Sequence, residues 1–422
     1  TSDVRHHVKV VRVDAEATPA RTEALIEISA ATTGEIEGPP TLIEQHARWT
    51  CDWEITADRH LRLLSLEVTD FEESTHQGVW FSDSTAAAVG DDDQLRAQLG
   101  RGLNHWLQRI ERAHGLHVFA RYGLAVGDAN GDGREDLYLC QPAGLPNRLL
   151  LQQADGTLAV AEHPGGDWLD PTSSALFVDL DNDGDQDLAL ALASGLLVLE
   201  NDGTGQFEVA QHVETQDSDT QSLSAVDFDQ DGDLDLYLCF DFARSLEHDF
   251  VYHDANDGGR NLLFRNDSTP GNWNFVDATA EVGLDTNNQR HSLAASWADF
   301  DNDGDADLYV ANDYGQNCLY RNDGGQFTEI APEAGVVDFG SGMSVSWGDA
   351  DRDGQLDLYV GNMFSSAGNR ITRQRQFKPD DDGTTREVYR RFAKGNSLFQ
   401  NDNGVFKEIS GDAGVEMARW AW

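Results

Sequence analysis

The sequence predicts a mainly β fold, a β-propeller preceded by a small α+β domain. Three observations support it. An acidic loop close to DxDxDGxxDL occurs five times, the loops begin at residues 128, 179, 227, 299 and 349, and each unit holds about four short strands separated by Asn, Asp and Gly turns. Four strands in about 50 residues match a propeller blade, whereas the repeats of a calcium-binding β-helix are near nine residues. We therefore expect five recognisable blades out of about six or seven in a complete propeller.

Each acidic loop offers oxygen side chains at positions 1, 3, 5 and 9 and a glycine at position 6. The side chains are Asp128, Asn130, Asp132 and Asp136; Asp179, Asp181, Asp183 and Asp187; Asp227, Asp229, Asp231 and Asp235; Asp299, Asp301, Asp303 and Asp307; and Asp349, Asp351, Asp353 and Asp357. Calcium takes about six to eight oxygen ligands, so a chain that binds it must curl and point alternate side chains inward. An aliphatic run follows every loop, where an EF-hand would continue into a helix. We expect about five structural Ca²⁺ sites, each leading into a strand.

Plain Asp and Gly turns without a metal are the alternative, because these residues are common in turns. Carboxylates held within a few ångströms of one another repel strongly without a cation. No Lys or Arg recurs at a fixed loop position to neutralise them. Five copies with the same oxygen positions therefore favour calcium.

The first 115 residues differ from the repeats and are expected to form the α+β domain, with residues 116–422 forming the propeller. Residues 8–13, 24–28, 47–55 and 61–68 alternate between apolar and polar, as half-buried antiparallel strands do. Residues 91–114 have apolar side chains on one side of a helix. A twisted sheet that cradles this helix is the expected arrangement.

The repeats resemble a known family. An Asn-Asp hairpin follows each of the last four loops, at Asn201, Asn266, Asn322 and Asn401, and with the loops it looks like the FG-GAP/VCBS repeat of integrin α-subunit propellers. Segments such as 361–370 look closer still to bacterial proteins related to cartilage acidic protein and UnbV. The resemblance covers about residues 116–422 and implies a calcium-binding propeller. By the spacing of the repeats a sixth loop would begin just after Trp422, so we expect an incomplete propeller whose open edge could self-assemble.

Charge excludes one class of partner. The chain has 30 Lys and Arg against 75 Asp and Glu, a net charge of -45, which argues against binding to nucleic acid. No apolar stretch is long enough for a membrane span, and the first residues do not look like a signal peptide. Open loops of this kind suit the high calcium outside cells. We therefore expect an extracellular, periplasmic or cell-surface location.

Two insertions interrupt the repeats. Residues 241–260 contain His248 and His253 among several Asp residues. Such a density of His and Asp could bind a transition metal or serve acid-base chemistry. A solvated polar loop is the alternative. Residues 369–394 contain eight basic side chains, and the candidates for binding an anionic partner are Arg370, Arg373, Arg375, Arg390 and Arg391. The alternative is a segment that folds back on the chain's own acidic surface.

The predicted function is a calcium-dependent adhesion module that binds a protein or glycan. A polysaccharide lyase or hydrolase, with a pocket formed by the two insertions, is a second hypothesis, and a filament or lattice subunit is a third. The sequence has no Gly-x-Ser-x-Gly elbow, P-loop or dinucleotide fingerprint. We therefore assign no catalytic residue and leave the question of enzyme activity open.

Overall fold

The computed structural model describes residues 4–32, 41–78, 82–90, 92–106, 108–109, 122–162, 164–216, 219–242, 254–269, 271–379 and 383–417. The chain divides into two compact units. The sheet unit consists of Thr1–Asp83 and Phe364–Lys394, and the propeller unit consists of Ser84–Met363 and Gly395–Trp422. No described helix is long and apolar enough to cross a membrane.

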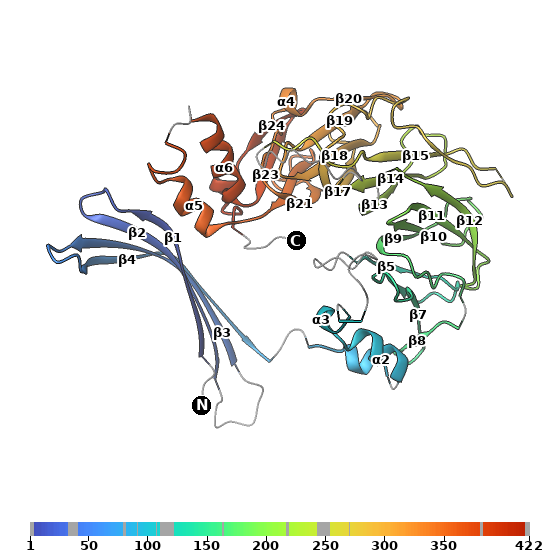
Figure 1. The fold of residues 1–422 in the computed structure, drawn as a ribbon, viewed down its shortest axis with the longest axis horizontal. Helices are drawn as coiled ribbons and strands as arrows, with labels where there is room; N and C mark the ends of the chain where they lie inside the picture. The colour runs from blue at the N-terminus through green and yellow to red at the C-terminus, as the bar shows by residue number, and fades with distance from the viewer. Residues whose placement is uncertain are drawn as a thin grey trace. The chain divides into compact units, whose positions relative to one another are not determined.

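The propeller unit contains five four-stranded antiparallel sheets, one for each acidic loop (Figure 1). In chain order the sheets are β5 (Leu124–Gly127), β6 (Asp136–Leu139), β7 (Arg148–Gln152) and β8 (Leu158–Val160); β9 (Thr172–Val178), β10 (Asp187–Leu192), β11 (Gly195–Asn201) and β12 (Phe207–Glu214); β13 (Thr220–Val226), β14 (Asp235–Phe240), β15 (Leu262–Asn266) and β16 (Phe275–Asp277); β17 (His291–Ala298), β18 (Asp307–Asp313), β19 (Cys318–Asn322) and β20 (Phe327–Glu329); and β21 (Gly342–Gly348), β22 (Asp357–Asn362), β23 (Ser397–Asp402) and β24 (Val405–Glu408). The predicted β-propeller is confirmed, with five blades in the described part of the chain.

Every acidic loop joins the first strand of a blade to the second. The last residue of the first strand pairs with the Asp at loop position 9, as Ala298 pairs with Asp307 in the fourth blade. First strands of successive blades, β5, β9, β13, β17 and β21, pack beside one another. The five loops therefore lie at equivalent places in five equivalent blades.

The core of the propeller unit lies between neighbouring sheets. All six residues of β10 and of β14 are buried, because the second strand of a blade is covered on both faces and its sequence is apolar throughout. Cys140, Cys239 and Cys318 are free thiols in this core. Burial raises the pKa of each thiol to about 12, so they act as small apolar side chains.

The sheet unit contains one antiparallel sheet in the order β1 (Val4–Asp14), β2 (Ala20–Thr32), β3 (Thr41–Ile55) and β4 (Leu61–Gln77). All four predicted strands are present and are longer than the sequence pattern indicated. Two helices from the basic insertion, α5 (Ser366–Thr372) and α6 (Thr384–Lys394), belong to the same unit. Helix α5 packs on β1, where Arg370 Nη1 donates a hydrogen bond to the Val10 carbonyl at 3.1 Å.

The helix expected over residues 91–114 differs from the observed structure. Helices α2 (Asp93–Leu99) and α3 (Leu103–Trp106) are separated by a segment that contains Gly100 and Gly102, which favour interruption of a helix. Residues 110–114 lie outside the described part. Leu95 is buried against Leu150 of β7, so α2 covers the first blade rather than the sheet of β1–β4. The short helices α1 (Thr85–Ala88), α4 (Ala331–Ala334) and α7 (Ser410–Ala413) complete the propeller unit.

Candidate metal centres and the insertion face

The acidic loops share an unusual backbone. Loop position 6 is always a glycine, and in every loop this glycine has a left-handed φ. Loop position 4 is left-handed as well, with φ of 71° at Gly131, 62° at Asn182, 59° at Gln230, 61° at Asn302 and 65° at Arg352. Two left-handed residues in three curl the chain tightly enough to bring the side chains at positions 1, 3 and 5 together. The amino-acid type at position 4 varies too much to signal this conformation.

Backbone amides orient the carboxylates of each loop. In the fourth loop Asp299 accepts hydrogen bonds from the backbone amides of Asp303 at 3.1 Å and Gly304 at 3.0 Å. Asp303 accepts one from Asp305 at 3.0 Å. Carboxylate oxygens lie within 4.8 Å of one another in four groups: Asp179, Asp181 and Asp187; Asp227, Asp229 and Asp235; Asp299, Asp301 and Asp303; and Asp349, Asp351 and Asp353. The loops thus bring predicted ligands together as the sequence indicated.

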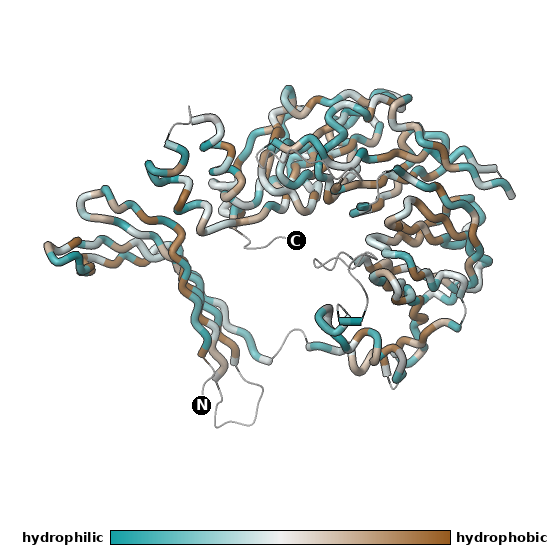
Figure 2. The backbone as a smooth tube through the Cα atoms, in the orientation of Figure 1, coloured by the Kyte–Doolittle hydropathy of each residue, from teal (hydrophilic) through white to brown (hydrophobic). Residues whose placement is uncertain are grey.

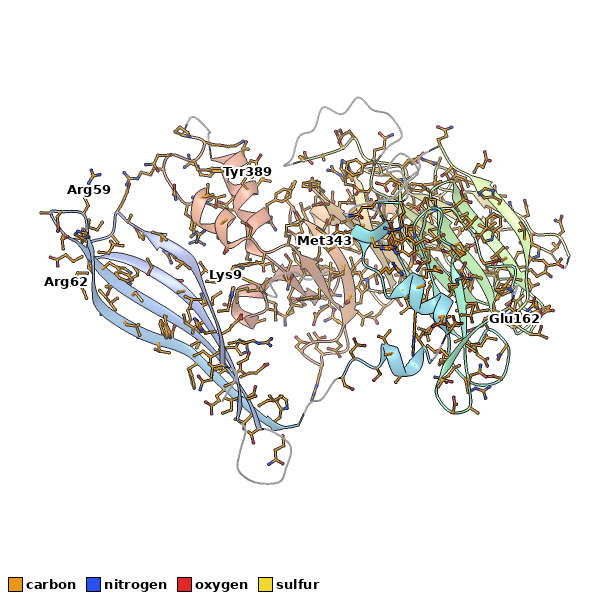
Figure 3. All side chains as sticks on the ribbon, turned by 60° about the horizontal axis from the view of Figure 1, so that its bottom comes forward. Lys9, Arg59, Arg62, Glu162, Met343 and Tyr389 are labelled. Atoms are coloured by element: carbon orange, nitrogen blue, oxygen red, sulfur yellow. The ribbon has the colours of Figure 1, made fainter. Side chains whose placement is uncertain are left out.

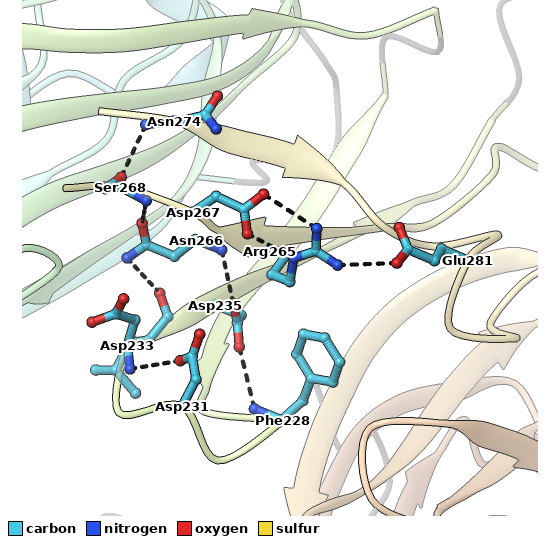
Figure 4. A network of polar contacts seen from close by, with 11 residues as sticks. Phe228, Asp231, Asp233, Asp235, Arg265, Asn266, Asp267, Ser268, Asn274 and Glu281 are labelled. Atoms are coloured by element: carbon cyan, nitrogen blue, oxygen red, sulfur yellow. Dashed lines mark hydrogen bonds and ion pairs between the residues drawn. The ribbon is translucent and has the colours of Figure 1, made fainter. Parts of the chain in front are cut away.

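The Asp at position 9 is buried and ties each loop to its blade. Asp235 accepts a hydrogen bond from the Phe228 amide at 3.2 Å and another from the Asn266 amide at 2.8 Å (Figure 4). The same pair of contacts recurs at Asp187 and Asp307. Burial, more than neighbouring charge, raises the pKa of each of these three carboxyls to about 7. Position 9 therefore holds the loop closed in addition to offering oxygens.

Several loop oxygens are buried without a hydrogen-bond donor. They are Oδ1 of Asp179, Asp185, Asp229 and Asp301. Burial and the nearby carboxylates raise the pKa of Asp229 and Asp301. A buried carboxylate oxygen without a partner is costly, and a hard divalent cation coordinated by oxygen atoms would satisfy it. The residues of these loops therefore fit Ca²⁺.

Asp185 shows that the sequence analysis missed an acidic position. It occupies loop position 7, where the third and fourth loops have Asp233 and Asp305. Burial and neighbouring carboxylates raise the pKa of Asp185 to about 6. The Asn182 side-chain amide donates to Asp233 of the next loop at 2.7 Å, so position 7 also joins successive loops. The sequence did contain evidence for this position, because the second, third and fourth loops share the pattern DGDxD, in which the second Asp is position 7.

The first loop has the fewest acidic side chains at the four ligand positions. Its position 3 is Asn130, and Arg134 at position 7 forms an ion pair with Asp132. Arg134 Nε also donates to the Gln152 carbonyl at 2.9 Å. Since the chain supplies its own cation here, this loop is expected to bind a metal ion more weakly than the others.

A buried asparagine connects each of the last four blades to the loop before it. The residues are Asn201, Asn266, Asn322 and Asn401, and in each case Nδ2 donates at 2.8 Å to the carbonyl of position 2 in the preceding loop. The sequence marked these residues as hairpins but did not indicate their contact with another blade. The loops and the blade interfaces are thus parts of one hydrogen-bonded structure.

Comparison with known proteins supports this description. A family model described as the FG-GAP-like repeat matches residues 128–190, 179–238 and 299–360. Three stretches of the chain are therefore similar to FG-GAP-like repeats. A search of curated proteins finds no match.

Two solved structures are similar to this chain at low sequence identity. One is an Agrocybe aegerita lectin from a study of the recognition of non-reducing terminal N-acetylglucosamine, with 12% identity, a TM-score of 0.39, and coverage of 99% of this chain and 83% of the lectin. The other is a Lactobacillus plantarum protein with 11% identity, a TM-score of 0.38, and coverage of 96% of this chain and 95% of that one.

The propeller unit also contains a buried charged cluster, at the ends of the third and fourth blades opposite their acidic loops. His291, at the start of β17, places Nδ1 2.8 Å from Asp241 and Nε2 3.3 Å from Asp257 of the first insertion. Both ring nitrogens can donate only in the imidazolium form. Burial lowers the pKa of His291, but the hydrogen bonds and charges of the two carboxylates outweigh this and raise it overall. The cluster therefore anchors residues 254–260 to the propeller.

A polar cavity of about 450 Å³ lies beside this cluster, lined by residues that include Asn256, Arg260, Asn288 and Arg290. Arg290 is 9% exposed and its Nη1 donates to Asp254 at 2.8 Å, whereas its buried Nε has no partner among the described residues. Amide and guanidinium groups suit hydroxyl or anionic groups of a ligand.

Of the predicted partner-binding residues, the arginines belong to one pair of packed helices: Arg370 lies in α5, Arg373 and Arg375 follow it, and Arg390 and Arg391 lie in α6. His248 and His253 lie outside the described residues. Arg375 lies 3.0 Å from Glu16, and Arg390 lies 3.0 Å from Glu387 within α6. Since the first insertion belongs to the propeller unit and the second to the sheet unit, the two insertions are parts of different units.

Proposed function

We propose that this chain is a calcium-binding β-propeller that acts outside the cytoplasm as a binding module for a protein or glycan. The observation that carries the proposal is the set of buried loop oxygens without a donor, at Asp179, Asp185, Asp229 and Asp301, beside grouped carboxylates. Calcium supplies positive charge there and closes each loop onto the strand that follows. Its contribution is structural, and no step of catalysis is assigned to it.

The proposed location follows from the chemistry of the loops. Each loop keeps at least one carboxylate exposed, and in the fifth loop Asp349, Asp351 and Asp353 are all exposed. Such open oxygen sites are filled at the high calcium concentrations found outside cells. A net charge of -45 keeps the chain soluble and is partly neutralised when the loops are loaded. The resemblance to bacterial relatives of cartilage acidic protein stays a prediction consistent with this location.

The basic helices α5 and α6 are the proposed contact for an anionic partner. Arg373 is exposed, and the Arg375 side chain is 84% exposed although it lies beside Glu16. An ion pair this exposed contributes little, so a sulfate or carboxylate group of a partner can replace Glu16. Arginine pairs with such groups in a bidentate geometry.

Binding of the full chain to immobilised sulfated and carboxylated polysaccharides, measured in millimolar calcium by biolayer interferometry, tests the proposal. Arg373→Glu and Arg375→Glu should each weaken binding at least about tenfold, or about 1.4 kcal/mol. Lys407→Glu makes the same charge change at an exposed position of β24 and should leave binding nearly unchanged. Equal losses in all three variants would indicate general charge attraction, and absence of binding to the whole panel would remove the anionic glycan from the proposal.

A further inference from the structure

The polar cavity of the propeller unit lies between two connections at the end of the third blade opposite its acidic loop. Residues 254–260 lead into β15, and residues 285–290 lead from β16 towards β17. Figure 2 shows these connections as hydrophilic, whereas the buried strand β14 of the same blade is largely hydrophobic. The cavity volume of about 450 Å³ lies within the range of small-molecule sites, which is about 300–1,000 Å³.

Hydrogen bonds fix the walls of this cavity. The Gly258 amide donates to the Gln289 carbonyl at 3.2 Å and so joins the two connections. The Asn288 side chain is held at both ends, because Nδ2 donates to the Asn261 carbonyl at 3.0 Å and Oδ1 accepts from the Asn261 amide at 3.1 Å. The cavity is therefore preformed, which lowers the entropic cost of binding a ligand.

Arg290 is a buried arginine that lines this cavity, and its side chain is 9% exposed. Its Nη1 donates to Asp254 at 2.8 Å and to the Ala255 carbonyl at 3.1 Å. Its buried Nε has no hydrogen-bond partner among the described residues. Nε and Nη2 form one edge of the planar guanidinium, and this edge binds both oxygens of a carboxylate. A buried donor without a partner is destabilising, so a ligand oxygen at this edge would recover free energy.

Other arginines of the same blade bind carboxylates in this way. Arg265 donates to Asp267 from Nε at 2.7 Å and from Nη2 at 3.2 Å, while its Nη1 contacts Glu281 (Figure 4). Arg260, which also lines the cavity, contacts two carboxylates, both at 2.9 Å. This acidic chain therefore holds two carboxylates on one guanidinium twice, whereas Arg290 contacts one in the described part of the chain.

A smaller cavity at the corresponding end of the first blade provides a comparison. Its volume is about 310 Å³, and it is lined by residues that include Arg148 and Glu162, the second of which is labelled in Figure 3. Arg148 Nε donates to Oε1 of Gln98 in α2 at 3.0 Å, so the chain itself supplies the acceptor. The described residues supply none to Nε of Arg290, and an acceptor from outside the chain would complete its hydrogen bonds.

We propose that this cavity binds a small carboxylate that also carries hydroxyl groups, of the class of the uronic acids, with its carboxylate on the Nε edge of Arg290. The side-chain amides of Asn256 and Gln289, both exposed, and the Asp285 carboxylate offer donors and acceptors to the hydroxyl groups. Asp254 and Asp285 lie beside the two lining arginines, so a single negative charge is favoured over the greater charge of a phosphate. This site goes beyond the proposed function and does not involve the arginines of α5 and α6.

Binding of sodium glucuronate to the full chain in millimolar calcium, measured by saturation-transfer difference NMR, tests the proposal. We expect a dissociation constant of about 1 mM or lower, as for a good ligand of this size. Glucose, which lacks the carboxylate, and inorganic phosphate should bind at least about tenfold more weakly.

Two matched substitutions test the role of Arg290. Arg290→Lys keeps the positive charge but lacks the bidentate edge, and it should weaken glucuronate binding at least about tenfold. Arg265→Lys makes the same change in the same blade at a residue that does not line the cavity and should leave the affinity unchanged. All variants are compared at the same free calcium concentration.

Asp254→Asn tests the site with Arg290 in place. It removes a negative charge beside the guanidinium and should tighten glucuronate binding about two- to fivefold, with a larger effect at low salt. Arg373→Glu, in the contact proposed for the sheet unit, should leave glucuronate binding unchanged, so the two proposals can fail separately.

Three results with the parent chain would overturn the proposal: no binding of glucuronate, equal affinity for glucose, or tighter binding of phosphate. An Arg290→Lys variant that melts like the parent chain and keeps its affinity would overturn it as well. If Arg290→Lys melts at a lower temperature, Asp254→Asn decides, and unchanged or weaker binding in that variant contradicts a carboxylate beside Arg290.

Discussion

At the scale of single residues, substitution of Asp301 is expected to change the melting temperature in opposite directions with and without calcium. Its buried Oδ1 has no donor, and it lies among Asp299 and Asp303. Asp301→Asn removes one charge from a repelling group, so the variant should melt at a higher temperature than the parent chain in EGTA. In saturating calcium it should melt at a lower temperature, because it binds the ion more weakly by about tenfold or more.

Thermal melts in both conditions measure this reversal. Asp323→Asn is the control in the same blade, because Asp323 lies in the turn between β19 and β20, is half-exposed, and has Arg321 as its side-chain partner in the described part of the chain. A variant that is more stable than the parent chain in calcium as well as in EGTA would contradict a metal ion at this loop.

His291 should make stability depend on pH. Its pKa is raised in the folded chain by Asp241 and Asp257 despite its burial, so the folded state binds the proton more tightly than the unfolded state. That stabilisation is complete below about pH 6.5, the unfolded value, and is lost as pH rises through the higher folded pKa. His291→Gln should therefore lower the free energy of unfolding by roughly 3–5 kcal/mol while His291 is protonated, and by progressively less above the folded pKa.

Denaturant unfolding of the parent chain and of His291→Gln, at saturating calcium and at pH values below and above about 6.5, measures the difference in their free energies of unfolding. Asp313 also lies in this cluster, and burial raises its pKa to about 6, so the comparison uses the difference between the two proteins and not the pH profile of either one. A difference that is constant with pH would show that His291 contributes only packing.

At the scale of elements, the hairpin asparagines should be as important for stability as the core. Asn322 is fully buried, and its Nδ2 donates to Phe228 of the preceding loop and to Ala306 of its own loop. Asn322→Ala leaves two buried carbonyls without a donor and should lower the free energy of unfolding by roughly 2–4 kcal/mol. Urea unfolding measures this, with the exposed Asn274→Ala as the control; equal effects of the two substitutions would contradict a clamp between blades.

Most strands of the propeller unit could be predicted from the sequence, because the same short loop pattern, which is weak evidence in one copy, occurs five times. Five copies of one loop identified the strands on either side and most of the grouped carboxylates. The left-handed φ at Gln230 was not predictable, since nothing in a glutamine indicates that conformation, and the contact of Asn322 with Phe228 joins residues far apart in the chain. The periodicity of a sequence reports local structure and does not identify tertiary contacts of this kind.

The helical segments were harder to predict for the same reason. An amphipathic pattern shows that one side of a helix is buried but does not show which surface buries it. Leu95 packs on Leu150 of the first blade, and Arg370 bonds to Val10 of the first strand. Each contact links a segment to a unit that its place in the sequence does not suggest, which is why the division of the chain differs from a boundary near residue 115.

At the scale of the whole molecule, calcium should determine whether the propeller unit is stable. If each loop is held at about 100 times its dissociation constant, each site contributes roughly 2.7 kcal/mol. Removal of calcium leaves the carboxylate groups unneutralised in a chain of net charge -45. Differential scanning calorimetry should show a large fall in melting temperature in EGTA that sodium chloride restores only in part, since salt screens charge but does not coordinate. Full recovery in sodium chloride alone would indicate screening rather than binding.

The asparagine that connects each blade to the preceding loop also connects one candidate calcium site to the next. Closing the fourth loop around an ion fixes Asp307, whose carboxylate holds the Asn322 amide, and Asn322 in turn holds Phe228 of the third loop. Occupation of one site therefore pre-organises its neighbour. The chain should load calcium cooperatively along the row of blades, over a narrower concentration range than independent sites allow. A small rise in calcium concentration should then fill most of the sites together.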